Sequence, residues 1–231
     1  MTLGYKDIMR VARRFLVYGL PAYVLIVLGG CAGTAAPPPP VDTTGSVATD
    51  QTEAQLLAEL NTKFENPQAH YGLARLYHKS QNWNKAEYHY VRAISFDPGN
   101  KAAQAGLVKM FADSGEKAKA EQFANGYIRQ AAISVTETLR LGWEFEQLGM
   151  DDYALRCYRQ AVAAAPDSDA ANKQIGMYYL HKGDKTNAKK YLMRSFELNP
   201  RQPDVAGELG RLGVVVQTPG IPEGPLEEKK K

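Results

Sequence analysis

The sequence repeats itself with a period of 34 residues. An alanine recurs at this interval at Ala86, Ala120, Ala154 and Ala188. The same interval separates an aromatic residue (Tyr77, Phe111, Phe145, Tyr179) and a large aliphatic one (Leu73, Leu107, Leu141, Ile175). A period of about 20–50 residues is typical of arrays in which each unit packs against its neighbours. The period therefore predicts four units, at residues 67–100, 101–134, 135–168 and 169–202.

Each unit is predicted to form two antiparallel helices. Turn residues lie in the middle of three units (Gly115, Gly149, Gly183), and prolines, which cannot continue a helix, lie near the end of three (Pro98, Pro166, Pro200). We expect helix pairs at 67–80 and 83–96, 101–114 and 117–130, 135–148 and 151–164, and 169–182 and 185–198. The predicted fold is therefore all-α, a solenoid of about four helical hairpins.

This pattern resembles the tetratricopeptide repeat over residues 67–202, without an insertion. In that family, small residues let the two helices of a hairpin approach closely, and here they are Ala74, Gly142 and Gly176 in the first helix. Large residues of the second helix fill the space between hairpins, and here they are Tyr90, Tyr158 and Leu192. The resemblance implies a right-handed superhelix whose first helices line a concave groove.

The second unit departs from the pattern. Val108 replaces the small residue, Ala124 and Tyr127 exchange the large and small places of the second helix, and Ala132 stands where proline is expected. The total side-chain volume is roughly kept, so we expect a repacked but intact hairpin with a local change of superhelix pitch.

Both flanks of the array are predicted to be capping helices. Residues 51–66 place Leu56, Leu57, Leu60 and Phe64 on one helical face, which would cover the first repeat. Residues 203–213 place Val205, Leu209 and Leu212 against the last repeat. Residues 214–231 are rich in Pro, Gly and charge and are predicted to form a flexible tail.

Residues 1–30 are typical of a signal peptide. A basic start precedes an apolar run, Phe15 to Leu28, which is too short for a comfortable bilayer span. The run ends in Leu28-Gly29-Gly30-Cys31, which resembles the bacterial lipobox. That resemblance implies that Cys31 is lipidated and becomes the mature N-terminus. The alternatives are a plain secretory signal with a chance cysteine and an uncleaved membrane anchor.

Residues 31–50 are predicted to be a lipidated N-terminus and a Pro-rich tether, because they hold too few large apolar side chains to fold. A partner-binding proline motif is the alternative. Ala32 follows the cysteine, and the lack of an aspartate there resembles outer-membrane sorting. We therefore expect a lipid anchor in the outer membrane, with the repeats facing the periplasm.

The composition argues against several classes of function. Residues 1–30 hold four of the 28 basic and one of the 25 acidic residues, so the remainder has 24 of each and is not expected to bind nucleic acid. No phosphate-binding loop, metal-ligand spacing or nucleophile motif is present, so we expect no enzyme activity, cofactor or metal. His70 is expected to pack between helices, in a place where the family often has Trp, and Cys157 to be a buried, inert thiol.

The family geometry selects the residues expected to line the groove. They are Tyr71, Arg75, His78, Lys109, Leu139, Trp143, Glu146, Gln147, Lys173, Met177 and His181. An exposed Trp and Met flanked by cations would suit an extended or helical peptide. Some members of the family hold a chaperone's terminal carboxylate with a set of Lys, Asn and Arg. The corresponding places here hold Tyr71, Arg75, Ala105 and Lys109, so that clamp is absent.

Lipobox, tether and repeat array together resemble the tight-adherence (Flp) pilus assembly lipoprotein and the type IV pilus pilotin, which bind or deliver a secretin. The first hypothesis is therefore an envelope scaffold whose protein partner is a secretin or pilus component. The second is a β-barrel assembly accessory lipoprotein, and the third is an adaptor that regulates peptidoglycan hydrolases. No motif separates the two pilus families of the first hypothesis. The second hypothesis ranks below the first, because β-barrel assembly accessory lipoproteins have more divergent repeats and less regular proline spacing.

Overall fold

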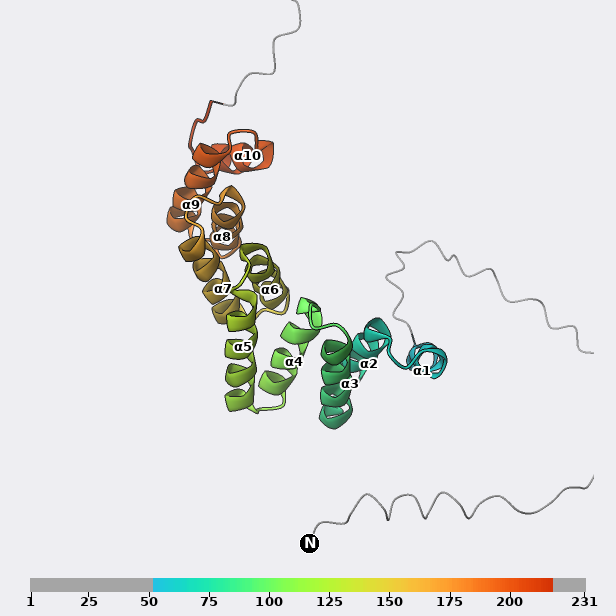
Figure 1. Cartoon of the computed structure of the whole chain (residues 1–231). Helices are drawn as coiled ribbons and strands as arrows, with labels where there is room; N and C mark the ends of the chain where they lie inside the picture. The colour runs from blue at the N-terminus through green and yellow to red at the C-terminus, as the bar shows by residue number, and fades with distance from the viewer. Residues whose placement is uncertain (1–51, 218–231) are drawn as a thin grey trace, which may run out of the picture. The chain divides into compact units, whose positions relative to one another are not determined.

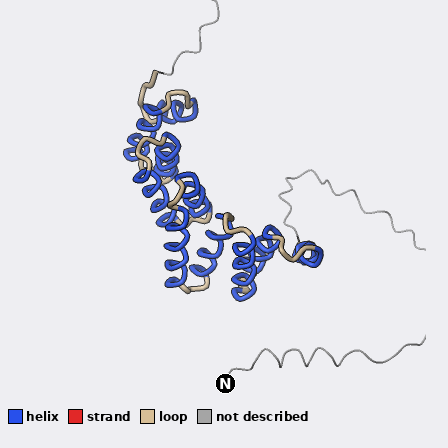
Figure 2. Tube along the Cα trace, in the orientation of Figure 1, coloured by secondary structure: helices blue, strands red, loops and turns tan. Residues whose placement is uncertain are grey.

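The computed structural model describes residues 52–217, all of which belong to one unit, Ala48–Lys231. Figures 1 and 2 show that these residues form helices joined by short loops, and no strand occurs among them. The all-α helical-repeat prediction is thus confirmed. Among the ten helices of this range, none combines the length and the apolar character that a membrane crossing requires. The predicted signal peptide 1–30, Cys31, the tether 31–50 and the tail beyond residue 217 lie outside the described residues.

Eight helices form four antiparallel pairs in chain order, and a shorter helix flanks them at each end. The first is α1 (Glu53–Thr62). The pairs are α2 (Pro67–Lys79) with α3 (Trp83–Phe96), α4 (Lys101–Asp113) with α5 (Lys117–Ala131), α6 (Val135–Gln147) with α7 (Asp151–Ala164), and α8 (Asp169–His181) with α9 (Lys185–Leu198). The last is α10 (Pro203–Arg211). The expected bounds of the paired helices agree with these to within one residue.

The loops show why each helix begins and ends where it does. Side-chain oxygens cap the N-termini of most paired helices, as Asn66, Asn100, Ser134 and Ser168 do for α2, α4, α6 and α8. Three of the turns inside the pairs use glycines with φ between 69° and 86°. In the first pair the same place holds Gln81, with φ 58°, the one non-glycine residue at positive φ among residues 52–217.

Small residues set the distance between the helices of a pair. A Cβ added at Gly142 would lie 2.7 Å from a ring carbon of Tyr158, and one added at Gly176 would lie 2.8 Å from Leu192. Tyr158 and Leu192 are themselves fully buried. The small-residue positions inferred from the repeat pattern therefore do mark the close approaches.

The second repeat forms an intact hairpin, as expected, but its packing differs. Val108 is fully buried at the small-residue position, and α4 contacts α5 less extensively than the helices of the other pairs contact each other. Gly106 makes a close approach to the preceding repeat, because a Cβ there would lie 2.5 Å from the ring of Tyr90 in α3. Helix α4 is consequently buried along most of its length.

The flanking helices cover the array with fewer residues than the sequence suggested. In α1, Leu56 and Leu60 are buried, but Leu57 is 45% exposed, so its prediction as a packing residue is wrong. Phe64 lies beyond the end of α1 and is 52% exposed, with its ring edge against His70. The helix ends two residues before Phe64, which moves that side chain off the predicted face.

At the other end, Val205 and Leu209 of α10 are buried against Leu192 and Phe196 of α9, as predicted. Val214 and Val216, which the sequence pattern assigns to the tail, pack against the same cluster.

Candidate functional site

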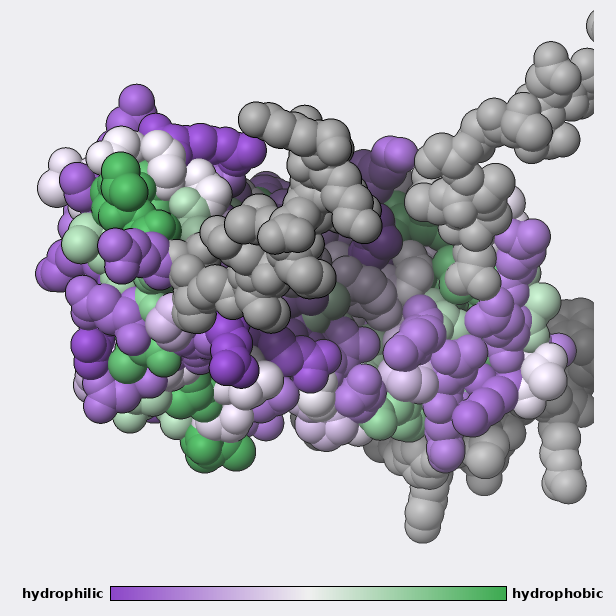
Figure 3. Space-filling model, turned by 90° about the horizontal axis from the view of Figure 1, so that it is seen from above, coloured by the Kyte–Doolittle hydropathy of each residue, from purple (hydrophilic) through white to green (hydrophobic). Residues whose placement is uncertain are grey.

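A pocket of about 820 Å³ lies over the first helices of the array. Its walls come from α1, α2, the turn after α2, α3, α4 and the residue that follows α6, Leu148. The size is within the range of roughly 300–1,000 Å³ common for ligand sites. On the face seen in Figure 3, by contrast, hydrophobic residues form small patches separated by hydrophilic ones. This pocket is therefore the strongest candidate for a binding site among the described residues.

Four of the residues predicted to line the groove line this pocket. They are Tyr71, Arg75, His78 and Lys109. The structure adds two aromatic side chains, Trp83 and Tyr90, whose rings complete the wall with Tyr71. The side chains of α2 and α4 meet here because repeats one and two place corresponding turns of their first helices side by side.

Asp113 is the acidic residue in the pocket wall, and each of its carboxylate oxygens has a partner. His78 Nε2 donates a hydrogen bond to Asp113 Oδ2 at 3.0 Å, and Lys109 forms an ion pair with the other carboxylate oxygen. Burial alone would raise the pKa of Asp113, but these two donors outweigh it and hold the pKa below its ordinary value. The Tyr90 hydroxyl lies 3.3 Å from His78 Nδ1 and completes the cluster.

Arg75 differs from Lys109 because no carboxylate among residues 52–217 forms an ion pair with it. Within residues 52–217, neither Arg75 nor Lys79 takes part in an ion pair. The guanidinium lies over the Tyr71 ring, 5.8 Å from its centroid. The pocket therefore carries an excess of positive charge next to aromatic faces.

A second cluster repeats the first one two units further along. Glu146 Oε1 accepts from His181 Nδ1 at 3.0 Å, and the Tyr158 hydroxyl donates to Glu146 Oε2 at 2.7 Å. His78 and Asp113 are 35 residues apart, as are Glu146 and His181. The two clusters thus join successive first helices with the acid and the histidine exchanged.

The other predicted groove residues do not join the pocket. Trp143 is 47% exposed. Lys173 forms an ion pair with Asp204 of α10, and Met177 packs against the cluster that α10 covers. Leu139 is half-buried against the core, and Gln147 is exposed. The capping helix therefore occupies part of the surface predicted for repeat four.

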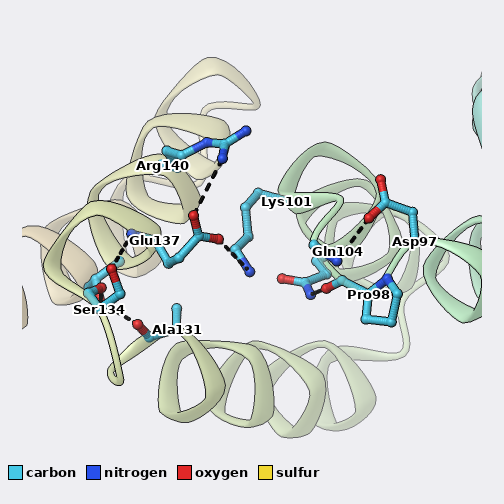
Figure 4. Close-up of polar contacts among 10 residues, drawn as sticks. Asp97, Pro98, Lys101, Gln104, Ala131, Ser134, Glu137 and Arg140 are labelled. Atoms are coloured by element: carbon cyan, nitrogen blue, oxygen red, sulfur yellow. Dashed lines mark hydrogen bonds and ion pairs between the residues drawn. The ribbon is translucent and has the colours of Figure 1, made fainter.

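Buried polar side chains tie each repeat to the turn before it. They occupy the fourth position of every repeat, as His70, Gln104, Thr138 and Asn172. Each bonds a backbone carbonyl six or seven residues earlier, those of Phe64, Pro98, Ala131 and Pro166. Figure 4 shows the Gln104–Pro98 bond beside the Lys101–Glu137 ion pair, which joins α4 to α6 at 3.2 Å.

His70 has a second partner, His89 of α3. A carbonyl can only accept, so His70 Nε2 donates to the Phe64 oxygen at 3.0 Å and Nδ1 is left as an acceptor. His89 Nδ1 then donates to it at 2.9 Å. Burial, the His70 ring and Lys85 together lower the pKa of His89 to about 4, against a small opposing effect of Glu53. The interhelical packing role expected for His70 agrees with its full burial.

Two further features bear on chemistry. Cys157 is fully buried, and burial raises the pKa of its thiol to about 12, although Arg156 acts in the opposite direction. Over residues 52–217, no group of three or more His, Cys, Asp or Glu side chains is arranged to hold a metal ion.

The sequence reasoning missed several site residues. Asp113, Trp83, Gln81 and Tyr90 all line the pocket without having been selected. One signal was available for Asp113. A His and an acid at the same 35-residue spacing occur twice, as His78 with Asp113 and as Glu146 with His181. Such a recurrence links the end of one first helix to the next.

Comparison with known proteins gives a family match to parts of the chain. Residues 67–100 and 173–202 each match the tetratricopeptide repeat family. Cellulose synthase operon protein C of Pseudomonas fluorescens is 25% identical over 146 residues, which cover 60% of this chain and 11% of that protein. The chain thus spans about a tenth of the length of this relative.

Solved structures give weaker likenesses. PilF of Pseudomonas aeruginosa is 22% identical, with a TM-score of 0.36 over 63% of this chain and 67% of its own. YrrB, described as a TPR protein with an unusual peptide-binding site, is 16% identical, with a TM-score of 0.38 over 69% of this chain and 81% of its own. The family matches at both ends of the array, together with the paired helices, identify tetratricopeptide repeats at residues 67–100 and 173–202.

Proposed function

We propose that the chain is a protein-binding scaffold of the bacterial cell envelope, held at the outer membrane by a lipid on Cys31. The observation that carries the binding role is the pocket over α2 and α4, where an Arg75 without an ion-pair partner among residues 52–217 lies beside three aromatic side chains. The lipobox-like Leu28-Gly29-Gly30-Cys31 supports the anchor. A role in pilus or secretin assembly is the specific form we favour, on the resemblance in architecture set out above.

The binding role extends along the first helices to Trp143. This side chain is half exposed and lies outside the pocket, so its loss should remove little packing. Binding hot spots are enriched in Trp and lose about 2 kcal/mol or more on truncation. Trp143→Ala should therefore weaken partner capture at least tenfold while the melting temperature stays within a few degrees of wild type, since about 1.4 kcal/mol is one decade.

The measurement is affinity capture from detergent-solubilised envelopes, with thermal melting of each variant. Ile133→Ala is the control, because Ile133 is 89% exposed in the loop before α6. A secretin or pilus subunit among the captured proteins would support the specific role. Capture of peptidoglycan hydrolases alone, or equal losses for both variants, would contradict it.

The anchor is tested separately with Cys31→Ala. The substitution removes the proposed acyl acceptor, so the chain should leave the outer-membrane fraction and appear as a soluble or unprocessed product. Wild-type fractionation of this variant would show that the anchor is elsewhere.

A further inference from the structure

The pocket over α2 and α4 has a charge pattern that restricts what it can hold. Asp113 is balanced by Lys109 and His78, which leaves Arg75 and Lys79 as the remaining cations of its wall. A further acid, Glu144 of α6, acts electrostatically on Tyr71 but does not line the pocket. The wall as a whole therefore attracts a negative group.

The Arg75 side chain is positioned for a specific kind of negative group. Its guanidinium lies over Tyr71, and Arg75 lines the pocket with a planar edge of N–H donors. Such an edge matches a carboxylate, which it can bind through two parallel hydrogen bonds. Tyr90 stays protonated because burial raises its pKa, and its ring lies beside that of Tyr71, with centroids 6.2 Å apart.

The apolar part of the wall is arranged along the pocket. Leu56 of α1 and Leu148 after α6 both line it, and Leu76 and Trp83 lie in the same wall. These residues come from the capping helix and from repeats one and three. An occupant that meets all of them must continue in both directions, as an internal stretch of an extended chain does.

We propose that this pocket binds an extended acidic segment within a partner protein. A side-chain carboxylate of that segment pairs with Arg75, and a neighbouring apolar side chain packs against Tyr71, Tyr90 and Trp83. This inference rests on the proposed function, because it names the chemistry of the partner of the same site. Lys79 adds to the attraction without fixing the position of the segment.

The test uses the full chain in detergent and a fluorescein-labelled peptide in which Glu alternates with Leu and Tyr, amidated at its C-terminus. The same peptide with Gln in place of Glu is compared with it by fluorescence anisotropy. We expect the Glu peptide to bind at least tenfold more tightly than the Gln peptide. Higher salt should reduce this preference, because the attraction is between charges near the surface.

Arg75→Gln should abolish the preference for Glu, and Arg75→Lys should restore part of it. Arg92→Gln is the matched control. Arg92 also lies over a tyrosine ring, 5.3 Å from the centroid of Tyr88, and it likewise has no ion pair within residues 52–217, but it is on α3 outside the pocket. This variant should bind like wild type, and circular dichroism of both variants should show the same helix content.

Several outcomes would overturn the inference. One is equal binding of the Glu and Gln peptides, or no binding of either by wild type. Another is an equal loss in Arg92→Gln and Arg75→Gln. A Gln peptide with a free C-terminus that binds as tightly as the Glu peptide would assign the pocket to a chain end instead. If Arg75→Gln leaves envelope capture unchanged while Trp143→Ala removes it, this inference fails and the proposed function stands.

Discussion

His89 is held neutral by its surroundings. It lies between α2 and α3, where it donates to His70 and is in ring contact with Tyr77 and Tyr88. The donor and acceptor roles in the pair are fixed by the Phe64 carbonyl, so a proton added to His70 Nδ1 would place two N–H groups against each other, whereas a proton added to His89 goes to its Nε2. The pair therefore links the protonation of one side chain to the packing of the first repeat.

The stability of the protein should decrease as the pH falls from about 6.5 to about 4. An unfolded histidine binds its proton near pH 6.5, whereas folded His89 binds it near pH 4, so the unfolded state gains the proton first in this window. The loss should amount to roughly 2–3 kcal/mol. Urea unfolding of wild type and His89→Phe at several pH values measures it. His89→Phe should show a flatter pH profile even if it is less stable at pH 7. An unchanged slope would mean that His89 is protonated in the folded state.

At the scale of the helix pair, substitutions at two glycines in helix interiors distinguish the effect of packing on stability from the effect of helix propensity. Gly142 of α6 faces Tyr158 and Cys157, with no room for a Cβ, whereas Gly126 of α5 has nothing within 4 Å of one. Both substitutions to alanine gain the same intrinsic helix propensity, about 1 kcal/mol. Their difference in stability therefore reports the close approach alone.

We expect Gly142→Ala to destabilise the protein by about 1–3 kcal/mol, because it overpacks a contact with two buried side chains. Gly126→Ala should stabilise it by about 0.5–1 kcal/mol. Chemical denaturation of the two variants against wild type gives both values. Equal effects would show that α6 can move away from α7 at little cost.

The helix pairs were predictable because the same residue pattern recurs in every repeat. Small residues, prolines and turn glycines recur in phase, so an error at one position is corrected by the other copies. The second repeat was recognised as different for the same reason, since Val108 and Tyr127 break the phase. The pocket was predicted only in part. The repeat pattern predicts the helix face on which Arg75 and Lys109 lie. It does not predict which of these two cations forms an ion pair with Asp113.

The contacts between repeats depend on the angle at which one pair stacks on the next. This angle brings residues 35 positions apart together, as for Glu146 and His181, and it places α10 over Met177 and Lys173. None of these pairings follows from the pattern within one unit. The fourth-position side chains show the same limit, because their polar character is visible in the sequence whereas their carbonyl partners are not.

At the scale of the whole molecule, α5 has the weakest support of the eight paired helices. Its N-terminal residue Glu116 makes no side-chain cap, and α5 contacts α4 and α6 less extensively than α7 contacts α6 and α8. Helix α7 also lacks a side-chain cap, so it is a suitable comparison. Local stability in repeat arrays follows the contacts that each unit makes with its neighbours.

Native-state hydrogen exchange should therefore be faster in α5 than in α7. We expect the opening free energy of the amides in α5 to be lower by about 1 kcal/mol or more. Mass spectrometry of peptic fragments covering each helix measures this difference. Equal protection in the two helices would mean that the array opens only as a whole.

The fourth-position hydrogen bonds also determine where the chain can be divided. The sequence period suggests a cut before Lys101, Val135 or Asp169, where a new unit begins. Such a cut would separate Gln104, Thr138 or Asn172 from the carbonyl that it bonds, on Pro98, Ala131 or Pro166. A shortened chain that keeps these bonds must begin a few residues earlier, inside the last turn of the preceding unit. The boundaries of the repeating motif and the boundaries of a transplantable module are therefore different places in this protein.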